Sequence, residues 1–166
     1  MSMHRVYISL GTNLGDKERN LRLALKHIEE QIGKVVSLSA FYATAPWGFT
    51  SDNSFLNAAA CVETRLLPLD VLERTQSVER RLGRKQKSVN GAYKDRLIDI
   101  DLLLYDDWVV SDVSPSGARL TLPHPLMAER DFVLRPLAEI APQLLHPVLG
   151  KTVEQLHAGL LDKERC

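Results

Sequence analysis

The stretch of sequence that decides the fold runs from Arg96 to Tyr105 and reads RLIDIDLLLY. It holds the most apolar run in the chain, which predicts a buried β-strand from Leu97 to Tyr105. Asp99 and Asp101 are two residues apart, so on a strand their side chains leave the same face, with Cα atoms roughly 6.6 Å apart. The opposite face is expected to carry apolar side chains, those of Ile98, Ile100, Leu102 and Leu104.

Two neighbouring carboxylates repel each other, by about 1 kcal/mol at 4 Å in water and by more at a lower effective dielectric constant. A magnesium ion is one source of compensating charge, because Mg²⁺ is held by one or two carboxylates together with substrate phosphates. A lysine or arginine beside a solvated strand end is the other. The spacing of Asp99 and Asp101 leaves both interpretations open.

The segments before this strand predict a sandwich of helices on a sheet. Three more strands are expected, over residues 4–10, 35–42 and 55–64. One helix is expected from its N-cap Asp16 to a glycine stop at Gly33, and a second from Pro68 to Gly83. The order β-α-β-β-α-β is that of the ferredoxin-like α+β core.

The remainder of the chain is expected to add a C-terminal extension of short helices and strands to this core. Asp106 and Asp107 predict a turn into Trp108–Val110, and Ser111–Arg119 is expected to be a mobile connection. Five prolines are expected to break the rest into short helical pieces: Pro123, Pro125, Pro136, Pro142 and Pro147. With no second boundary visible, residues 1–166 are expected to form a single domain.

Composition excludes several classes of protein. Lysine plus arginine equals aspartate plus glutamate at 21 each, so there is no overall field to attract nucleic acid or an anionic membrane. The two cysteines, Cys61 and Cys166, make neither a disulfide framework nor a metal-binding spacing, which favours a reducing, cytoplasmic setting. No signal-peptide core and no apolar run of roughly 18 residues is present, so a soluble protein is expected.

Basic and aromatic residues supply candidate binding groups, each with a plainer alternative. Eight basic residues flank the Asp99–Asp101 strand and either hold phosphates or form a solvated surface: Arg84, Lys85, Lys87, Lys94, Arg96, Arg119, His124 and Arg130. The loop Gly11–Gly15 lacks the Lys-Ser/Thr ending of a phosphate loop and is interpreted as a strand-to-helix turn. Residues Thr44–Trp47, Phe55 and Asn57 either bind a planar heterocycle or are ordinary core residues.

Taken together, these segments resemble the 6-hydroxymethyl-7,8-dihydropterin pyrophosphokinases of folate biosynthesis, from about Tyr7 to Leu149. The matching segments, in order, are Gly11-Thr12-Asn13-Leu14-Gly15, Phe41-Tyr42-Ala43-Thr44-Ala45-Pro46, Phe55-Leu56-Asn57-Ala58-Ala59, Gln76-x-x-Glu79 with Gly83-Arg84, Arg96 to Leu102, Leu122-Pro123-His124-Pro125, and Arg130-x-Phe132. The order and spacing of the whole series make the resemblance specific.

The resemblance implies that ATP donates its β,γ-pyrophosphoryl group to the hydroxymethyl oxygen of the pterin and leaves as AMP. It implies two Mg²⁺ ions held by Asp99 and Asp101, with Arg84 and Arg96 as further catalytic residues. The positions that match the family around ATP are Gln76, Glu79, Arg84, Arg96, Leu102, Arg119, Thr121, His124, Pro125 and Arg130. The positions that match around the pterin are Thr44, Ala45, Trp47, Phe55, Asn57, Asp99 and Phe132, with Phe55 and Phe132 on the two faces of the ring. A monomer is expected.

The sequence departs from the family mainly in the loop 84–95, where Gln86 replaces the common second arginine and the arginine-tryptophan pair of some members has no clear counterpart beyond Asn90 and Tyr93. Ala45 and Pro125 also differ from the residues usual at their positions. Two other functions remain compatible with the residues alone: a nucleotidyl- or glycosyltransferase that uses the same Asp-x-Asp metal site, and a non-catalytic ferredoxin-like module that binds RNA or a small regulator.

Overall fold

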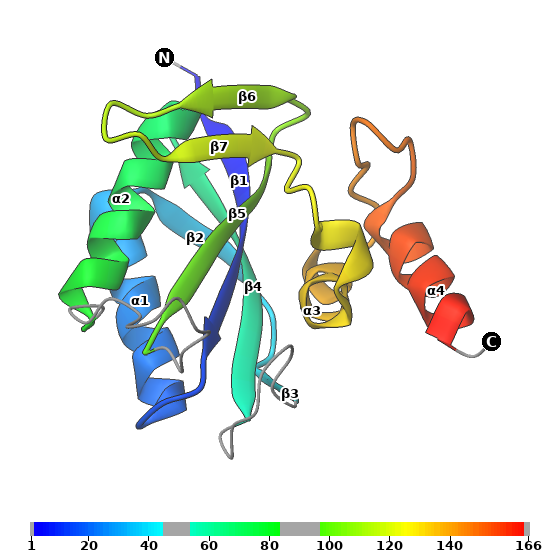
Figure 1. Cartoon of the computed structure of the whole chain (residues 1–166), viewed down its shortest axis with the longest axis horizontal. Coiled ribbons are helices and arrows are strands. Elements are labelled where there is room, and N and C mark those ends of the chain that lie inside the picture. Colours follow the sequence, from blue (N-terminus) through cyan, green and yellow to red (C-terminus); the bar gives the residue numbers. More distant parts are fainter. Residues whose placement is uncertain (1, 45–53, 84–96, 165–166) are drawn as a thin grey trace.

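An antiparallel sheet forms the centre of the molecule (Figure 1). The computed structural model describes residues 2–44, 54–83 and 97–164. Within them the strands lie in the order β2-β4-β1-β5, and the short strand β3 pairs with β4. The strands are β1 (His4–Thr12), β2 (Lys34–Leu38), β3 (Tyr42–Thr44), β4 (Phe55–Thr64) and β5 (Asp99–Tyr105).

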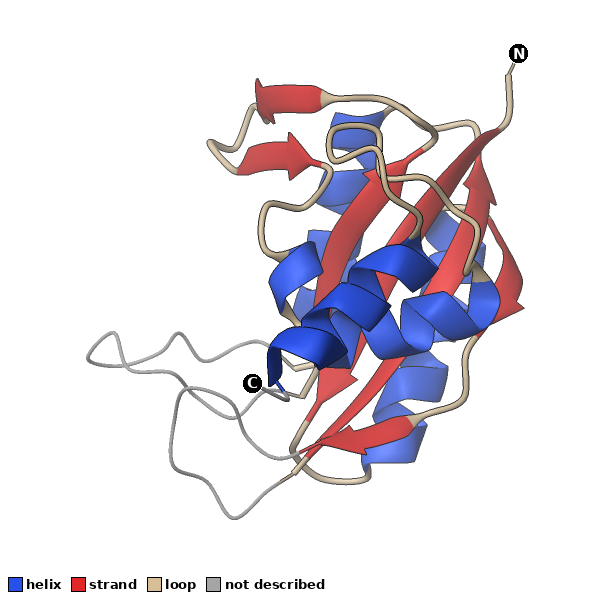
Figure 2. Ribbon diagram, turned by 90° about the vertical axis from the view of Figure 1, so that its right-hand side faces the viewer, coloured by secondary structure: helices blue, strands red, loops and turns tan. Residues whose placement is uncertain are grey.

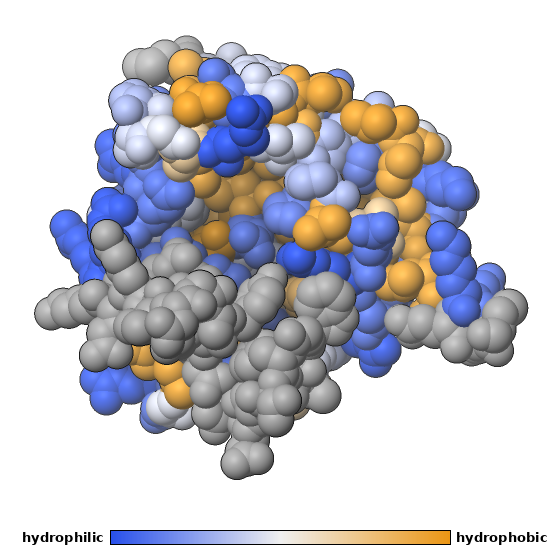
Figure 3. Space-filling view, in the orientation of Figure 1, coloured by the Kyte–Doolittle hydropathy of each residue, from blue (hydrophilic) through white to orange (hydrophobic). Residues whose placement is uncertain are grey.

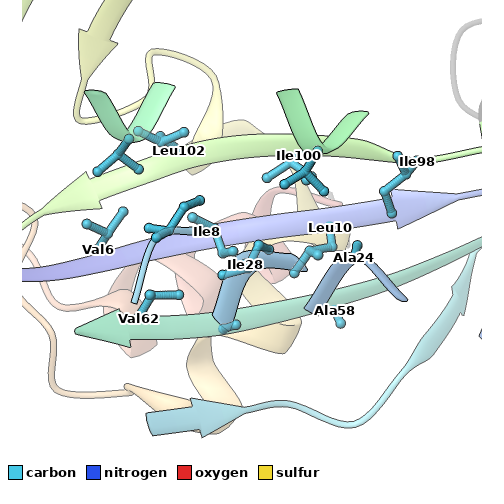
Figure 4. Close-up of a cluster of buried hydrophobic side chains, with 14 of the residues drawn as sticks. Val6, Ile8, Leu10, Ala24, Ile28, Ala58, Val62, Ile98, Ile100 and Leu102 are labelled. Carbon is cyan, nitrogen blue, oxygen red and sulfur yellow. The ribbon is translucent and has the colours of Figure 1, made fainter. Parts of the chain in front are cut away.

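Helices α1 (Lys17–Gln31) and α2 (Pro68–Arg81) cover one face of this sheet. The expected start signals are confirmed, because the Asp16 side chain accepts the N–H of Arg19 at 3.2 Å and Pro68 is the first residue of α2. Between helices and sheet lies the helix-side core (Figure 4), which includes Val6, Ile8, Leu10, Ala24, Ile28, Ala58, Val62, Ile98, Ile100 and Leu102. Burial of this apolar surface is what holds the helices on the sheet.

Helix α3 (Asp131–Ile140) lies against the other face, and α4 (Val153–Glu164) packs against α3 on its outer side (Figure 1 and Figure 2). The second core between them and the sheet consists of Tyr7, Ala59, Cys61, Leu103, Leu104, Met127, Val133, Leu134, Leu137 and Val153. Asp131 joins the two helices, since its carboxylate lies 3.1 Å from Arg135 Nη2 and 2.9 Å from His157 Nε2. An antiparallel sheet with helices on both faces makes the fold α+β, as predicted.

Two strands differ from their predicted form because each contains a bulge. Leu103 is the extra residue where Ile8 pairs with Leu102 and Tyr7 with Leu104, so Leu104 joins the second core and not the face of Ile98 to Leu102. The expected strand from Val35 to Tyr42 is divided into β2 and β3 by an irregular segment at residues 39–41. The fourth predicted strand also begins later, at Asp99 instead of Leu97.

The C-terminal part of the chain is more regular than its sequence suggests. The expected mobile connection from Ser111 to Arg119 is wrong, because β6 (Val110–Val113) and β7 (Arg119–Leu122) form a hairpin. Ser114 closes its turn by donating its N–H to the carbonyl of Ala118 at 2.8 Å. Pro136 does not break α3, since it is buried and the nearby Leu134 and Leu137 pack into the second core, which outweighs one lost backbone bond. Within the described ranges, no helix combines the length and apolarity that crossing a bilayer requires.

The expected stop at Gly33 is confirmed, but its cause is the close approach of β4. A Cβ atom at Gly33 would lie 1.9 Å from the backbone oxygen of Glu63. We therefore expect Gly33→Ala to lower the free energy of unfolding by about 3 kcal/mol, because backbone atoms must move apart. Chemical denaturation measures this loss.

Gly159→Ala is the matched control for this substitution. No atom lies within 4 Å of a Cβ added at Gly159 in α4, so this change is expected to stabilise the protein by roughly 0.5–1 kcal/mol. Equal effects of the two substitutions would contradict the packing described at Gly33.

Candidate functional site

A row of residues crosses the sheet on the face that α1 and α2 leave uncovered. Asp99 of β5 pairs with Gly11 of β1, Gly11 pairs with Asn57 of β4, and Asn57 pairs with Tyr42 of β3. We call these four residues the site row. Adjacent strands lie about 4.8 Å apart, so the Cα atoms of Asp99 and Asn57 are separated by roughly 10 Å. The second core covers the same face only as far as Ala59 and Leu103, so the site row lies beyond it.

The β5 end of the row carries the two carboxylates. Asp101 pairs with Ser9, two residues from Gly11, so Asp99 and Asp101 leave the same face, as predicted. Both are partly exposed, whereas Ile98 and Ile100 between and beside them are buried in the helix-side core. The site therefore offers a pair of anionic oxygen ligands at the edge of an apolar sheet.

The charges of Asp99 and Arg130 both act on the imidazole of His124. Burial, together with the positive charge of Arg130, lowers the pKa of His124, and the negative charge of Asp99 opposes this shift. The N–H of His124 donates to the carbonyl of Leu103 at 2.9 Å, which holds this loop against β5. The N–H of Leu126 donates to Nδ1 of His124 at 3.1 Å, so a neutral His124 carries its proton on Nε2. His124 is thus a neutral donor next to a carboxylate and a guanidinium group.

At the β4 end of the row, the amide of Asn57 and the ring of Phe55 lie near the backbone of Gly11, which has no side chain. Asn57 is 4% exposed, and its Nδ2 donates to Oγ1 of Thr44 at 2.7 Å, which orients the amide. A Cβ added to Gly11 would lie 2.9 Å from Oδ1 of Asn57 and 3.8 Å from Cδ1 of Phe55. The absence of a side chain at Gly11 therefore lets the Asn57 amide and the Phe55 ring pack closely on the backbone of β1.

Figure 3 shows the molecule hollowed beneath the β6–β7 hairpin, with hydrophobic surface at the base of the hollow and hydrophilic groups around it. Across residues 2–44, 54–83 and 97–164, no group of three or more metal-binding side chains occurs. Two carboxylates with open positions for substrate oxygens suit Mg²⁺, which keeps several non-protein ligands. The donor set of Asp99 and Asp101 therefore fits a magnesium ion that arrives with a phosphate-bearing substrate.

The comparison with protein families decides which proteins this chain is related to. The family model described as 7,8-dihydro-6-hydroxymethylpterin-pyrophosphokinase (HPPK) matches residues 7–142. The chain belongs to this family. A 2-amino-4-hydroxy-6-hydroxymethyldihydropteridine pyrophosphokinase of Porphyromonas gingivalis is 48% identical over 86% of this chain and 93% of its own length. The pyrophosphokinase of the same name from Methylorubrum extorquens is 45% identical over 95% of this chain and 94% of its own.

Solved structures share the fold at much lower identity. An HPPK-DHPS in complex with substrates superposes with a TM-score of 0.81 at 14% identity, over 99% of this chain and 44% of that one. A Plasmodium falciparum HPPK-DHPS has a TM-score of 0.82 at 17% identity, over 99% and 45%. The chain thus spans under half of these longer proteins, and the likeness to them is one of fold.

The site residues implied by the pyrophosphokinase family are distributed unevenly in the structure. Asp99, His124 and Arg130 lie together at one end of the site row, and Thr44 contacts Asn57 at the other. Phe132 is half-buried at the start of α3, with its ring centroid 5.6 Å from the Arg130 guanidinium carbon. Four implied residues lie outside the described ranges: Ala45, Trp47, Arg84 and Arg96.

Several of the residues that the family resemblance implies around ATP have side chains that do not lie on the face of the site row. Leu102 is buried in the helix-side core, so only its backbone is available to a ligand. Arg119 and Thr121 lie on the exposed face of β7, while Leu120 and Leu122 point into the molecule. Pro125 is exposed and Gln76 is half-buried on α2. Except for Leu102, these residues come from elements outside the central sheet.

Glu79 has a structural role that the family resemblance does not predict. It is 4% exposed on α2, and its Oε2 accepts the N–H of Ile100 at 2.9 Å. Ile100 stands between the two aspartates on β5, which is an edge strand of the sheet within the described residues, so its N–H depends there on an acceptor outside the sheet. Glu79 therefore anchors the backbone that carries Asp99 and Asp101 to α2.

Gly11 is the member of the site row whose place sequence reasoning missed. We expected it to be a turn glycine, but it lies in β1, at the centre of the site row. The signal that identifies it is its pairing with both Asp99 and Asn57, which depends on strand register and is not visible in a single segment.

We expect the bond between Glu79 and Ile100 to stabilise the fold. Glu79→Leu leaves a buried N–H without its acceptor and is expected to cost about 1–3 kcal/mol of unfolding free energy. Glu79→Gln keeps an oxygen acceptor and is expected to retain most of that stability. Urea denaturation of both variants measures the difference, and an equal loss in both would argue against this bond.

Proposed function

We propose that this chain transfers the β,γ-pyrophosphoryl group of ATP to the hydroxymethyl oxygen of 6-hydroxymethyl-7,8-dihydropterin in folate biosynthesis. The oxygen bonds to the β-phosphorus, the bond from that phosphorus to the bridging oxygen of the α-phosphate breaks, AMP leaves with that oxygen, and the hydroxyl proton is lost. The observation that carries the proposal is the site row, which has carboxylates at one end and an oriented amide at the other. The chain that contains this row belongs to the pyrophosphokinase family.

The β5 end is proposed to hold the triphosphate. Two Mg²⁺ ions, bound by Asp99 and Asp101 together with phosphate oxygens, would neutralise the charge that develops on the transferred group. His124 is proposed to donate to a phosphate oxygen from Nε2, and Arg130, whose charge acts on His124, is proposed to supply a cation there. Arg84 and Arg96 are proposed to add further phosphate contacts. Asp99 is also close enough to the centre of the row to orient the attacking hydroxyl group.

The β4 end is proposed to hold the pterin. The amide of Asn57 offers both an acceptor and a donor to the polar edge of the ring, while Thr44 keeps the amide oriented. Phe55 and Phe132 are proposed to lie on the two ring faces, with Ala45 and Trp47 beside them. The separation of roughly 10 Å between Asp99 and Asn57 leaves space for a bicyclic ring with its hydroxymethyl group directed toward β5.

The wider properties of the protein are also proposals. The strand order β2-β4-β1-β5, with α1 and α2 on one face, supports a ferredoxin-like core, and the sheet shared by both cores supports one domain over residues 1–166. We propose a monomer that acts in the cytoplasm on ATP and a reduced hydroxymethylpterin. The zero net charge gives it no general attraction for nucleic acid or membrane surfaces, and the buried free thiol of Cys61 suits a reducing compartment.

The direct test mixes the protein with ATP, Mg²⁺ and 6-hydroxymethyl-7,8-dihydropterin and identifies the nucleotide product by chromatography. AMP in a one-to-one ratio with the pterin diphosphate is expected. Formation of ADP, or no pterin-dependent turnover, would refute the proposed reaction.

Asp99→Ala and Asp101→Ala are each expected to lower kcat by roughly 10³-fold, because each removes an anionic ligand from the charge-stabilising site. Their melting temperatures should stay at or above that of the parent, since each change relieves repulsion between neighbouring carboxylates. Asp112→Ala, at an exposed position of β6, is the matched control and should leave kcat unchanged. Comparable loss in the control would show that the effect is not specific to the site row.

Gly11→Ala is expected to weaken pterin binding without unfolding the protein. The new methyl group would meet the end of the Asn57 side chain, which can rotate away only by leaving Thr44. We expect KM for the pterin to rise at least about tenfold, and KM for ATP to change by less than about twofold. Steady-state kinetics with each substrate varied in turn distinguishes this from a general loss of activity.

A further inference from the structure

The segment between β2 and β3 contains a bulge that has to be held in place. Leu38 pairs with Ala60 and Tyr42 with Asn57, so three residues of this segment face only two of β4. A bulge of this kind leaves backbone groups without strand partners. Ser39 connects the irregular segment to β4 with two hydrogen bonds. Its N–H donates to the carbonyl of Ala59 and its Oγ accepts the N–H of Ala59, both at 2.9 Å.

Glu139 of α3 forms hydrogen bonds with a backbone N–H of the bulge, that of Ala40. Both of its carboxylate oxygens accept the N–H of Ala40 at 3.1 Å, and the hydroxyl of Tyr42 donates to Oε1. This hydrogen bond, with burial and the nearby negative charge, raises the pKa of Tyr42, and Arg135 opposes the shift. One carboxylate therefore holds the end of the bulge and the first residue of β3, through charge-assisted bonds.

The register of β3 decides where Thr44 lies. With Tyr42 opposite Asn57, Thr44 stands opposite Phe55 and its hydroxyl accepts from the Asn57 amide at 2.7 Å. A slip of one residue would move the side chain of Thr44 to the other face of the sheet and leave the Asn57 amide without this acceptor. The orientation of Asn57 thus depends on the pairing of a strand only three residues long.

We propose that Glu139 is a positioning residue for the pterin site: by fixing Ala40 and Tyr42 it sets the register of β3 and so orients Asn57 through Thr44. This role of Glu139 rests on the proposed function, because it assumes that the pterin binds at Asn57. Phe132 and Glu139 are seven residues apart on α3, which places them on the same face of that helix, two turns from each other. The helix that carries a proposed ring contact therefore also anchors the strand opposite.

The test compares Glu139→Ala with the control Glu29→Ala. Glu29 is also exposed and also accepts a backbone N–H at the start of a strand, that of Val35 at 3.2 Å. It lies on α1 and its partner lies on β2, so the pair is away from the site row. The Kd for 6-hydroxymethyl-7,8-dihydropterin is measured by fluorescence titration with Mg²⁺ and a non-hydrolysable ATP analogue present. Glu139→Ala is expected to raise this Kd roughly tenfold and the Kd of the ATP analogue by less than about twofold, while Glu29→Ala changes neither.

Two milder variants keep the test decisive if Glu139→Ala does not fold. Glu139→Gln keeps one oxygen acceptor and Tyr42→Phe removes one hydroxyl group, so each is expected to raise the pterin Kd by a smaller factor than Glu139→Ala. An unchanged pterin Kd in the folded variants, or an equal rise for pterin and ATP analogue, would overturn the positioning role. A parent protein that binds pterin but forms no AMP would instead overturn the proposed reaction, and the affinities would still decide the role of Glu139.

Discussion

The antiparallel pairing of β1 with β4 on one side and β5 on the other is the constraint on which the rest of the structure depends. It places Gly11 between Asp99 and Asn57, which come from segments more than forty positions apart in the chain. Because side chains alternate along a strand, a shift of one residue in either pairing would turn a polar residue of the row into the helix-side core. The hydrophobic contacts of Val6, Ile8 and Leu10 prevent that shift, so the core that stabilises the fold also aligns the site.

The two faces of the sheet serve different purposes. The face under α1 and α2 is apolar from Val6 to Leu10 and from Ala58 to Val62, whereas the face under α3 is apolar near Tyr7 and Leu103 and polar from Ser9 and Asp101 onward. The polar end is supported from its edges: Glu79 anchors β5 to α2, and Glu139 anchors β3 to α3. Rigid support of this kind keeps reacting groups in a productive geometry, which is the main task of a protein that catalyses phosphoryl transfer.

Local patterns in the sequence were sufficient for features that involve one segment. The spacing of Asp99 and Asp101 predicted their common face, and Asp16 and Pro68 predicted the starts of α1 and α2. Features that arise between segments could not be predicted in the same way. The bulge at Leu103, the division of β2 from β3 and the pairing of Gly11 depend on strand register. The strands of the β6–β7 hairpin are four residues each, too short for their alternation to indicate a strand in the sequence. Nothing in the sequence around Glu79 distinguishes a buried glutamate that holds a strand from one that contacts a ligand.

The central claim is that both substrates meet along the row from Asp99 through Gly11 to Asn57. A crystal structure with Mg²⁺, a non-hydrolysable ATP analogue and 6-hydroxymethyl-7,8-dihydropterin tests it most directly. The pterin edge is predicted to bond to Asn57, its ring to lie over Gly11, and its hydroxymethyl oxygen to lie within about 3.5 Å of the β-phosphorus, with metal bound by Asp99 and Asp101. A pterin bound away from Asn57, or aspartates neutralised by protein cations without metal, would contradict the account.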